Sequence, residues 1–215
     1  MEFLPIFINL RKGLCLVTGG GQQALQKIQL LKKAGAVIHL AAPNGLCAEL
    51  QELLNQQQLQ LISGQPIDLD VSTYNLIIAA SEDQQANKLI AEKAQENNIP
   101  VNVVDRPELC SFLLPSIVDR SPLIVAVSSC GKSPTLSRFI RKKIAAFLPA
   151  SFGELAVMLG EFREKNKPYL QSYAAKKEFW KEMIFSGPLV ELFVSGKKDA
   201  ARKILEDELE LLRKT

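Results

Sequence analysis

One stretch decides the fold of this chain: Leu14-Cys15-Leu16-Val17-Thr18-Gly19-Gly20-Gly21. Its first five residues form a largely apolar run, which is typical of a strand covered on both faces, and three glycines end that run abruptly. Ala24, Ile28 and Leu31 then recur at helical spacing, and Gly35 stands where a helix stop belongs. The stretch therefore predicts a buried strand, a glycine turn and a helix.

The same alternation continues through the first half of the chain. Apolar runs predict further strands at residues 37–41, 59–63, 76–80 and 101–104, and helical patterns separate them at residues 46–55 and 83–96. Strands that alternate with helices in this way are joined by right-handed crossovers and pair in parallel. We therefore expect an α/β fold of the Rossmann type, a doubly wound parallel sheet with helices on both faces.

The alternation loosens after Asp105. Residues 112–118 and 123–127 are predicted as two strands joined by a hairpin-like turn at residues 119–122, and we expect them to add an irregular edge to the sheet. From Pro134 onward the patterns are helical. Ser151 is predicted to cap a helix with Glu154 as its capping-box partner, and further helices are predicted at residues 179–185 and 200–212.

These patterns divide the chain into three predicted regions. Residues 1–112 are predicted to form the α/β domain, residues 113–149 a small mixed region, and residues 150–215 a C-terminal helical domain. The last region carries many large apolar residues, more than a small appendage can bury alone, which predicts a homodimer. They are Phe152, Leu155, Met158, Leu159, Phe162, Phe179, Trp180, Phe185 and Leu192.

Composition narrows the class of protein. A net charge of +3, without a basic run interleaved with aromatics, does not indicate a nucleic-acid partner. No stretch approaches the roughly 20 apolar residues that span a bilayer, and apolar residues 1–10 have their basic residues after them, so we interpret them as structure and not as a signal. Four widely spaced cysteines indicate neither a metal site nor a disulfide framework and favour a reducing cytoplasm.

The glycine turn points to nucleotide binding. Glycines between a buried strand and a helix let backbone N–H groups approach a pyrophosphate at the helix N-terminus. The carboxylate that holds the ribose about 20 residues later is missing, because His39-Leu40-Ala41-Ala42 occupies that place. Charge therefore does not decide between NAD and NADP. His39, the sole histidine, is expected to be a strand residue satisfied by a local hydrogen bond, and no metal site is expected.

Asp105 is the candidate acid–base group. It follows the predicted strand at residues 101–104, at the carboxyl end where open α/β sheets bind ligands. Such a carboxylate can take up or release a proton while a nicotinamide accepts a hydride. The alternative role is a turn cap before Arg106-Pro107. Position alone leaves both interpretations open.

Several ordered motifs resemble the siroheme synthase dehydrogenase/chelatase family. They are Leu4-Pro5-Ile6-Phe7, the glycine turn with Ala24 and Lys27, Asn102-Val103-Val104-Asp105, the run from Phe112 through Pro115 to Leu123, and Val125-Ala126-Val127-Ser128-Ser129 followed by Gly131, Ser133 and Pro134. The resemblance covers about residues 1–149. The chain departs from the family pattern at Gln22, Gln23 and Gln26, at Cys130, which replaces a glycine, and at Lys132, which replaces a small hydroxyl residue.

The resemblance implies NAD-dependent oxidation of precorrin-2 to sirohydrochlorin, and in bifunctional members insertion of ferrous iron to give siroheme. It also implies that Asp105 is the essential aspartate and that the protein is a homodimer. In the regions defined above, it implies that residues 1–112 bind NAD and that residues 113–149 serve dimerisation and substrate binding. The candidate cofactor-binding residues are Gly19, Gly20, Gly21, Gln22, Gln23, Ala42, Ala80, Asn102 and Val104.

The implied substrate is a polycarboxylate tetrapyrrole, which calls for cationic and donor groups. The candidates are Ser116, Arg120, Ser128, Ser129, Lys132 and Arg138. For each cation the alternative is an ordinary solvated surface, and for the serines it is a strand end. Two rival functions also stay open: a dehydrogenase without chelatase activity, and a non-catalytic Rossmann-type module that binds a nucleotide or a tetrapyrrole.

Overall fold

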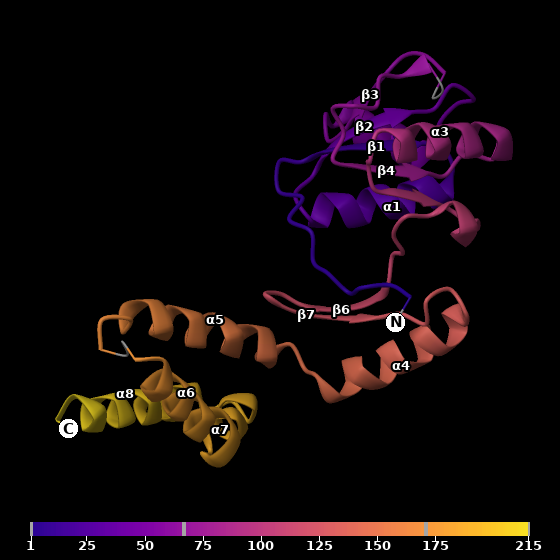
Figure 1. Ribbon diagram of the computed structural model, residues 1–215. Helices are drawn as coiled ribbons and strands as arrows, with labels where there is room; N and C mark the ends of the chain where they lie inside the picture. The colour runs from indigo at the N-terminus through magenta and orange to yellow at the C-terminus, as the bar shows by residue number, and fades with distance from the viewer. Residues whose placement is uncertain (1, 66–67, 170–171, 215) are drawn as a thin grey trace. The chain divides into compact units, whose positions relative to one another are not determined.

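The computed structural model describes residues 2–65, 68–169 and 172–214, and its contacts divide them into two compact units (Figure 1). Unit 1 holds residues 2–114 together with 130–132, and unit 2 holds residues 115–129 together with those from 133 onward. Residues 113–149 and 150–215, which we predicted as separate regions, thus fall largely within one unit. Their separate roles stay predictions.

Unit 1 is built on a five-stranded parallel sheet, which confirms the expected α/β fold. The strand order is β3-β2-β1-β4-β5. The strands are β1 (Leu14–Thr18), β2 (Val37–Ala41), β3 (Gln60–Leu61), β4 (Leu76–Ala79) and β5 (Val101–Val103). The helices between them are α1 (Gln22–Lys33), α2 (Ala48–Asn55) and α3 (Gln84–Glu96). A 3₁₀ turn, η2 (Pro107–Leu109), follows β5.

Alternation along the strands places a hydrophobic core on each face of this sheet, since successive side chains point to opposite sides. Cys15 and Val17 join α1 and α2 in one core, whereas Leu16 joins α3 in the other. The helices supply apolar residues at helical spacing, such as Ile28 from α1 and Ile90 from α3, and both are fully buried. Two covered faces explain the continuous apolar runs in the sequence.

The region after Asp105 differs from the prediction. Instead of adding an edge to the parallel sheet, β6 (Ser116–Arg120) and β7 (Leu123–Val127) pair with each other as a separate antiparallel hairpin in unit 2. The first strand begins later than predicted because Pro115 has no N–H to give to a ladder. Asp119 and Arg120, predicted in the turn, pair with the next strand, so only Ser121 and Pro122 turn the chain.

Helices make up the remainder of unit 2. They are α4 (Pro134–Phe147), α5 (Ser151–Lys165), α6 (Tyr173–Lys181), a π-helical turn η3 (Glu182–Ser186), α7 (Leu189–Val194) and α8 (Lys198–Lys214). No single helix in the described ranges is long and apolar enough to span a membrane, although α4 and α5 together, bent by 67°, pass the same test of length and composition.

The predicted capping box at Ser151 is wrong. Ala150 is the N-cap of α5, no side chain caps it, and Ser151 is already helical. The backbone begins the turn itself, because Gly153 N donates to Ala150 O at 2.9 Å. The carboxylate of Glu154 pairs with Lys198 of α8 and not with the start of α5.

Most of the C-terminal apolar residues from which we predicted a homodimer are covered within unit 2. The apolar residues of the C-terminal helices are largely buried within unit 2, where Leu155, Met158 and Phe179 belong to its core, and Phe185 is the exception at 85% exposed. The helices α5, α6, α7 and α8 pack against each other and cover apolar surface that we expected a small appendage to leave exposed. Exposed apolar side chains gather instead on α4, at Leu136, Phe139, Ile140 and Phe147.

Candidate cofactor and acid–base site

The glycine turn, Gly19–Gly21, has steric reasons to be glycine. Gly19 has φ +104, and a Cβ on it would lie 2.3 Å from the carbonyl oxygen of Ala80. A Cβ on Gly20 would lie 1.8 Å from the carbonyl oxygen of Gly45. The same Gly20 accepts a hydrogen bond from Cys47 N at 2.8 Å. The turn is therefore packed backbone to backbone against the residues after β2 and β4.

A cavity of about 300 Å³ opens beside this turn, at the carboxyl ends of the parallel strands. It is lined by Gly19, Gly20, Gly21, Ala42, Pro43, Asn44, Gly45, Leu46, Cys47, Ser81 and Glu82. At Gly21 nothing lies within 4 Å of where a Cβ would stand. The third glycine therefore leaves its backbone open, as close approach of a ligand requires.

Two further features suit an anionic group at this turn. Helix α1 begins without a side-chain cap and without an acidic residue in its first turn, so its positive end is not neutralised. The hydroxyl of Thr18, directly before the turn, is buried and lacks a hydrogen-bond partner within the described part of the chain. Backbone donors at a helix start form a phosphate site, and the chemistry of the turn fits the pyrophosphate of a dinucleotide.

Asp105 lies beside the glycine turn. Its carboxylate Oδ2 accepts a hydrogen bond from Gln23 Nε2 at 3.0 Å, and Gln23 belongs to the first turn of α1. The backbone of Asp105 has φ +62, a left-handed conformation that Asp adopts more readily than most residues. No side chain caps the η2 turn that follows. The interpretation of Asp105 as a turn cap is therefore supported by no hydrogen bond.

The thiol of Cys110 holds the backbone of this segment. Cys110 Sγ accepts from Val103 N at 3.1 Å and lies 3.3 Å from the carbonyl oxygens of Val103 and Arg106. Burial is the main cause that raises the pKa of the Cys110 thiol, so it stays protonated and donates to those carbonyls. Val104 N also donates to Ala79 O at 2.9 Å. The turn that carries Asp105 is thereby tied to β4 and β5.

The other candidate cofactor residues lie in different surroundings. Ala42 lines the cavity, whereas Ala80 lies under Gly19. Gln22 donates to Glu49 Oε1 at 3.1 Å, a contact that adds to a backbone hydrogen bond in lowering the pKa of Glu49. Asn102 is buried and donates to Phe112 O at 3.1 Å. Val104 packs against the core.

Sequence reasoning missed several lining residues. They are Pro43, Asn44, Gly45, Leu46 and Cys47 after β2, with Ser81 and Glu82 after β4. Their position in the sequence could have identified them, because each group directly follows a predicted strand, and both of these strands pair with β1. His39 has the expected local hydrogen bond, with its Nδ1 2.9 Å from the hydroxyl of Tyr74. Within the described ranges, no group of three His, Cys, Asp or Glu side chains is placed to hold a metal ion.

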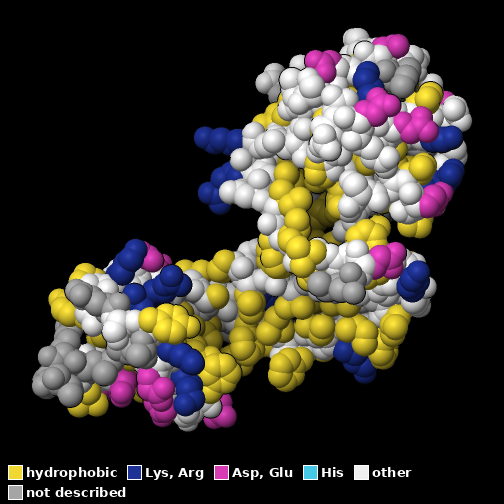
Figure 2. Space-filling view, in the orientation of Figure 1, with side chains coloured by type: hydrophobic (Ala, Val, Ile, Leu, Met, Phe, Trp, Pro, Cys, Tyr) yellow, Lys and Arg dark blue, Asp and Glu magenta, His cyan; other side chains and the backbone are white. Residues whose placement is uncertain are grey.

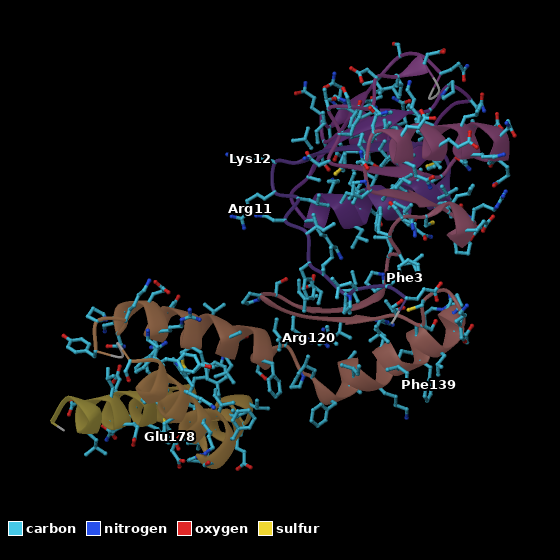
Figure 3. The ribbon with its side chains drawn as sticks, in the orientation of Figure 1. Phe3, Arg11, Lys12, Arg120, Phe139 and Glu178 are labelled. Carbon is cyan, nitrogen blue, oxygen red and sulfur yellow. The ribbon has the colours of Figure 1, made fainter. Side chains whose placement is uncertain are left out.

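The candidate substrate residues divide between the units, with Lys132 in unit 1 and the others in unit 2. Arg120 donates to the carbonyl oxygens of Leu148 at 2.7 Å, Ala145 at 3.2 Å and Asp119 at 3.0 Å, so it closes the C-terminal end of α4 (Figure 3).

The other candidates in unit 2 lie on β6, after β7 and on α4. Ser129 Oγ accepts from Ser133 N at 2.9 Å, at the start of α4. Ser116 begins β6, and Ser128 and Arg138 are exposed. A role in binding substrate stays a prediction for each of these residues.

Comparisons with known proteins agree with this geometry. Residues 6–116 match a family model described as putative NAD(P)-binding, and residues 151–209 match the sirohaem synthase dimerisation region. The siroheme synthase of Thioalkalivibrio sulfidiphilus is 44% identical over 98% of this chain and 42% of that protein. The siroheme synthase of Nitrosospira multiformis is 44% identical over 98% of this chain and 45% of that protein.

The chain thus spans less than half the length of these relatives. A solved structure of SirC, a precorrin-2 dehydrogenase, shares the fold with a TM-score of 0.74 at 24% identity, covering 97% of this chain and 99% of that one.

Proposed function

Because this chain belongs to the NAD(P)-binding siroheme synthase dehydrogenase/chelatase family, we propose that it oxidises precorrin-2 to sirohydrochlorin with NAD as the hydride acceptor. One observation carries the proposal. The glycine turn opens onto a cavity of about 300 Å³, and the carboxylate of Asp105 is hydrogen-bonded to the first turn of the same helix. A phosphate cradle and a proton-transfer group therefore share one edge of the sheet.

Different residues would bind the cofactor, transfer the proton and bind the substrate. Gly19–Gly21 and the start of α1 would hold the pyrophosphate, and Ala42 to Cys47 would line the adenosine side. NAD, when bound, supplies the acceptor for a hydride. Asp105 takes up the proton that the substrate loses in the same oxidation, at Oδ1, because Oδ2 is engaged by Gln23. For the substrate carboxylates, Lys132 is the candidate within unit 1, and the candidates of unit 2 are proposed separately.

The test is an anaerobic assay with precorrin-2 and NAD. We expect NADH and sirohydrochlorin to appear together in equal amounts. A protein that binds NAD but forms neither product would support a non-catalytic module, and one that binds no NAD would overturn the cofactor site.

Insertion of ferrous iron is the second activity that we propose. A tetrapyrrole supplies four nitrogens to the metal, so the protein needs only to hold the ring and accept the displaced protons. Asp105 offers an exposed carboxylate oxygen for that purpose. Supplying sirohydrochlorin and Fe²⁺ directly, without NAD, separates the two activities. Formation of siroheme no faster than the uncatalysed reaction would leave the protein a dehydrogenase only.

We also propose a homodimer in the cytoplasm. The match to a dimerisation region and the exposed apolar side chains of α4 support the dimer. Figure 2 shows hydrophobic side chains gathered over the segment that carries β6, β7 and α4. The proposed location rests on the four cysteines, which lie in the described ranges and form no disulfide there, as suits a reducing compartment.

A further inference from the structure

Gln23 connects the candidate acid–base group to the candidate cofactor site. Its side-chain amide donates to Asp105 Oδ2 at 3.0 Å across 82 residues of sequence. Gln23 lies two residues after Gly21, in the first turn of α1, and both partners of this hydrogen bond are exposed. The contact therefore spans from the helix of the glycine turn to the segment after β5.

The backbone and the side chain of Asp105 are held by different groups. The backbone is held by Val104 N, which donates to Ala79 O at 2.9 Å, and by the Cys110 thiol, which accepts from Val103 N at 3.1 Å. Neither contact restrains the carboxylate. An exposed carboxylate on rotatable bonds samples several rotamers. The amide of Gln23 selects the rotamer that directs the carboxylate toward α1.

The chemistry of an amide suits this task. Its NH₂ group donates to a carboxylate without carrying a charge, so it orients Asp105 and leaves Oδ1 to exchange a proton. A glutamate of the same length would place a second negative charge against the first. A methionine would keep the length and lose the donor.

We propose that Gln23 is a positioning residue that holds the Asp105 carboxylate for proton transfer. This role of Gln23 rests on the proposed function, the oxidation of precorrin-2. Losing one hydrogen bond to a charged group should lower the correctly oriented fraction about 5- to 20-fold. We expect Gln23→Met to lower kcat by this factor while the Kd for NAD and the KM for precorrin-2 change less than about 2-fold. Gln23→Glu should lower kcat further.

Two controls sharpen the test. Gln26 is an exposed glutamine of the same helix, and Gln26→Met should leave kcat unchanged. In an Asp105→Asn background, Gln23→Met should add little further loss, since residues that act through each other are not additive. A raised Kd for NAD with unchanged kcat would make Gln23 a cofactor contact and overturn the proposal, as would full additivity.

A measurement without substrate separates this inference from the proposed function. In the nuclear magnetic resonance spectrum of the protein alone, Asp105→Asn should shift the side-chain NH₂ signals of Gln23 and leave those of Gln26 in place. If wild-type protein forms no sirohydrochlorin but these signals shift, the proposed function fails while the contact stands. Unshifted Gln23 signals would overturn the positioning role directly.

Discussion

At the scale of single residues, Asp105 carries the sharpest expectation. Asp105→Asn keeps the size of the side chain and removes its ability to take a proton, so we expect kcat for precorrin-2 oxidation to fall by about 10²- to 10⁴-fold. The melting temperature and the Kd for NAD should stay nearly the same. Glu108→Gln, a matched change of an exposed carboxylate near the same turn, should leave kcat intact.

Measuring the three quantities on one preparation separates the two roles of Asp105. A turn cap would show a lower melting temperature with normal turnover at a permissive temperature. Near-wild-type turnover of Asp105→Asn would remove this carboxylate from the mechanism.

Gly20 and Gly21 are neighbours with opposite steric demands. A Cβ on Gly20 would meet the Gly45 carbonyl oxygen at 1.8 Å, whereas a Cβ on Gly21 meets nothing within 4 Å. We expect Gly20→Ala to lower the free energy of unfolding by about 1–3 kcal/mol because backbone must move, and Gly21→Ala to lower it by less than about 1 kcal/mol. Urea unfolding measures both. Equal losses would mean that the turn is not packed as described.

The thiol of Cys15 links pH to stability. Burial in β1 raises its pKa from 9.0 to about 11. The folded state therefore keeps a proton that the unfolded state loses, and the free energy of unfolding should fall as pH rises from 9 to 11, by about 2 kcal/mol. Cys15→Ala should remove that part of the slope in parallel titrations. An identical slope in wild type and variant would exclude the thiol as its source.

At the scale of elements, Arg120 serves the end of a helix. It donates to the carbonyl oxygens of Ala145 and Leu148 at the end of α4, where a positive charge also meets the negative end of the helix. We expect Arg120→Ala to lower the free energy of unfolding by about 1.5–3 kcal/mol, with Arg120→Lys recovering only part, since a lysine cannot reproduce the forked geometry.

The same variants test the role predicted for Arg120 in binding the substrate. A rise in KM for precorrin-2 with unchanged stability would favour the substrate role over the structural one.

At the scale of the whole molecule, we expect the proposed homodimer to use the exposed face of α4. Phe139 is 53% and Phe147 81% exposed, and Figure 3 shows Phe139 on the side of α4 away from the hairpin. Burying such side chains between two copies stabilises the pair, and a buried unpaired charge opposes it. We expect wild type to sediment as a dimer and Phe139→Glu to shift it toward monomer. Lys142→Glu, on an exposed residue of the same helix, serves as the control.

A wild-type protein that sediments as a monomer at all concentrations would contradict the dimer itself. Dissociation of the Lys142→Glu control to the same extent would show that charge, and not the apolar face, decides the association.

The sequence by itself determined the parallel sheet, its glycine turn and the position of Asp105 after a strand. Apolar periodicity and glycine placement are local properties, so they can be read from neighbouring residues. The strand that we predicted to begin at Phe112 begins only at Ser116, directly after Pro115. The capping box at Ser151 was wrong because Ser151 is already helical and Ala150 is the N-cap, and Glu154 pairs with Lys198, which is 44 residues away.

Only the tertiary structure decided which residues meet. Gln23 and Asp105 are 82 residues apart, and the clash that requires Gly20 to be glycine comes from Gly45. It also decided that Arg120 closes α4, that most of the C-terminal apolar residues bury one another, and that α4 keeps an exposed apolar face. The physical reason is that such contacts depend on how helices and strands pack in space. A pattern of neighbouring residues does not specify which distant residues they will contact.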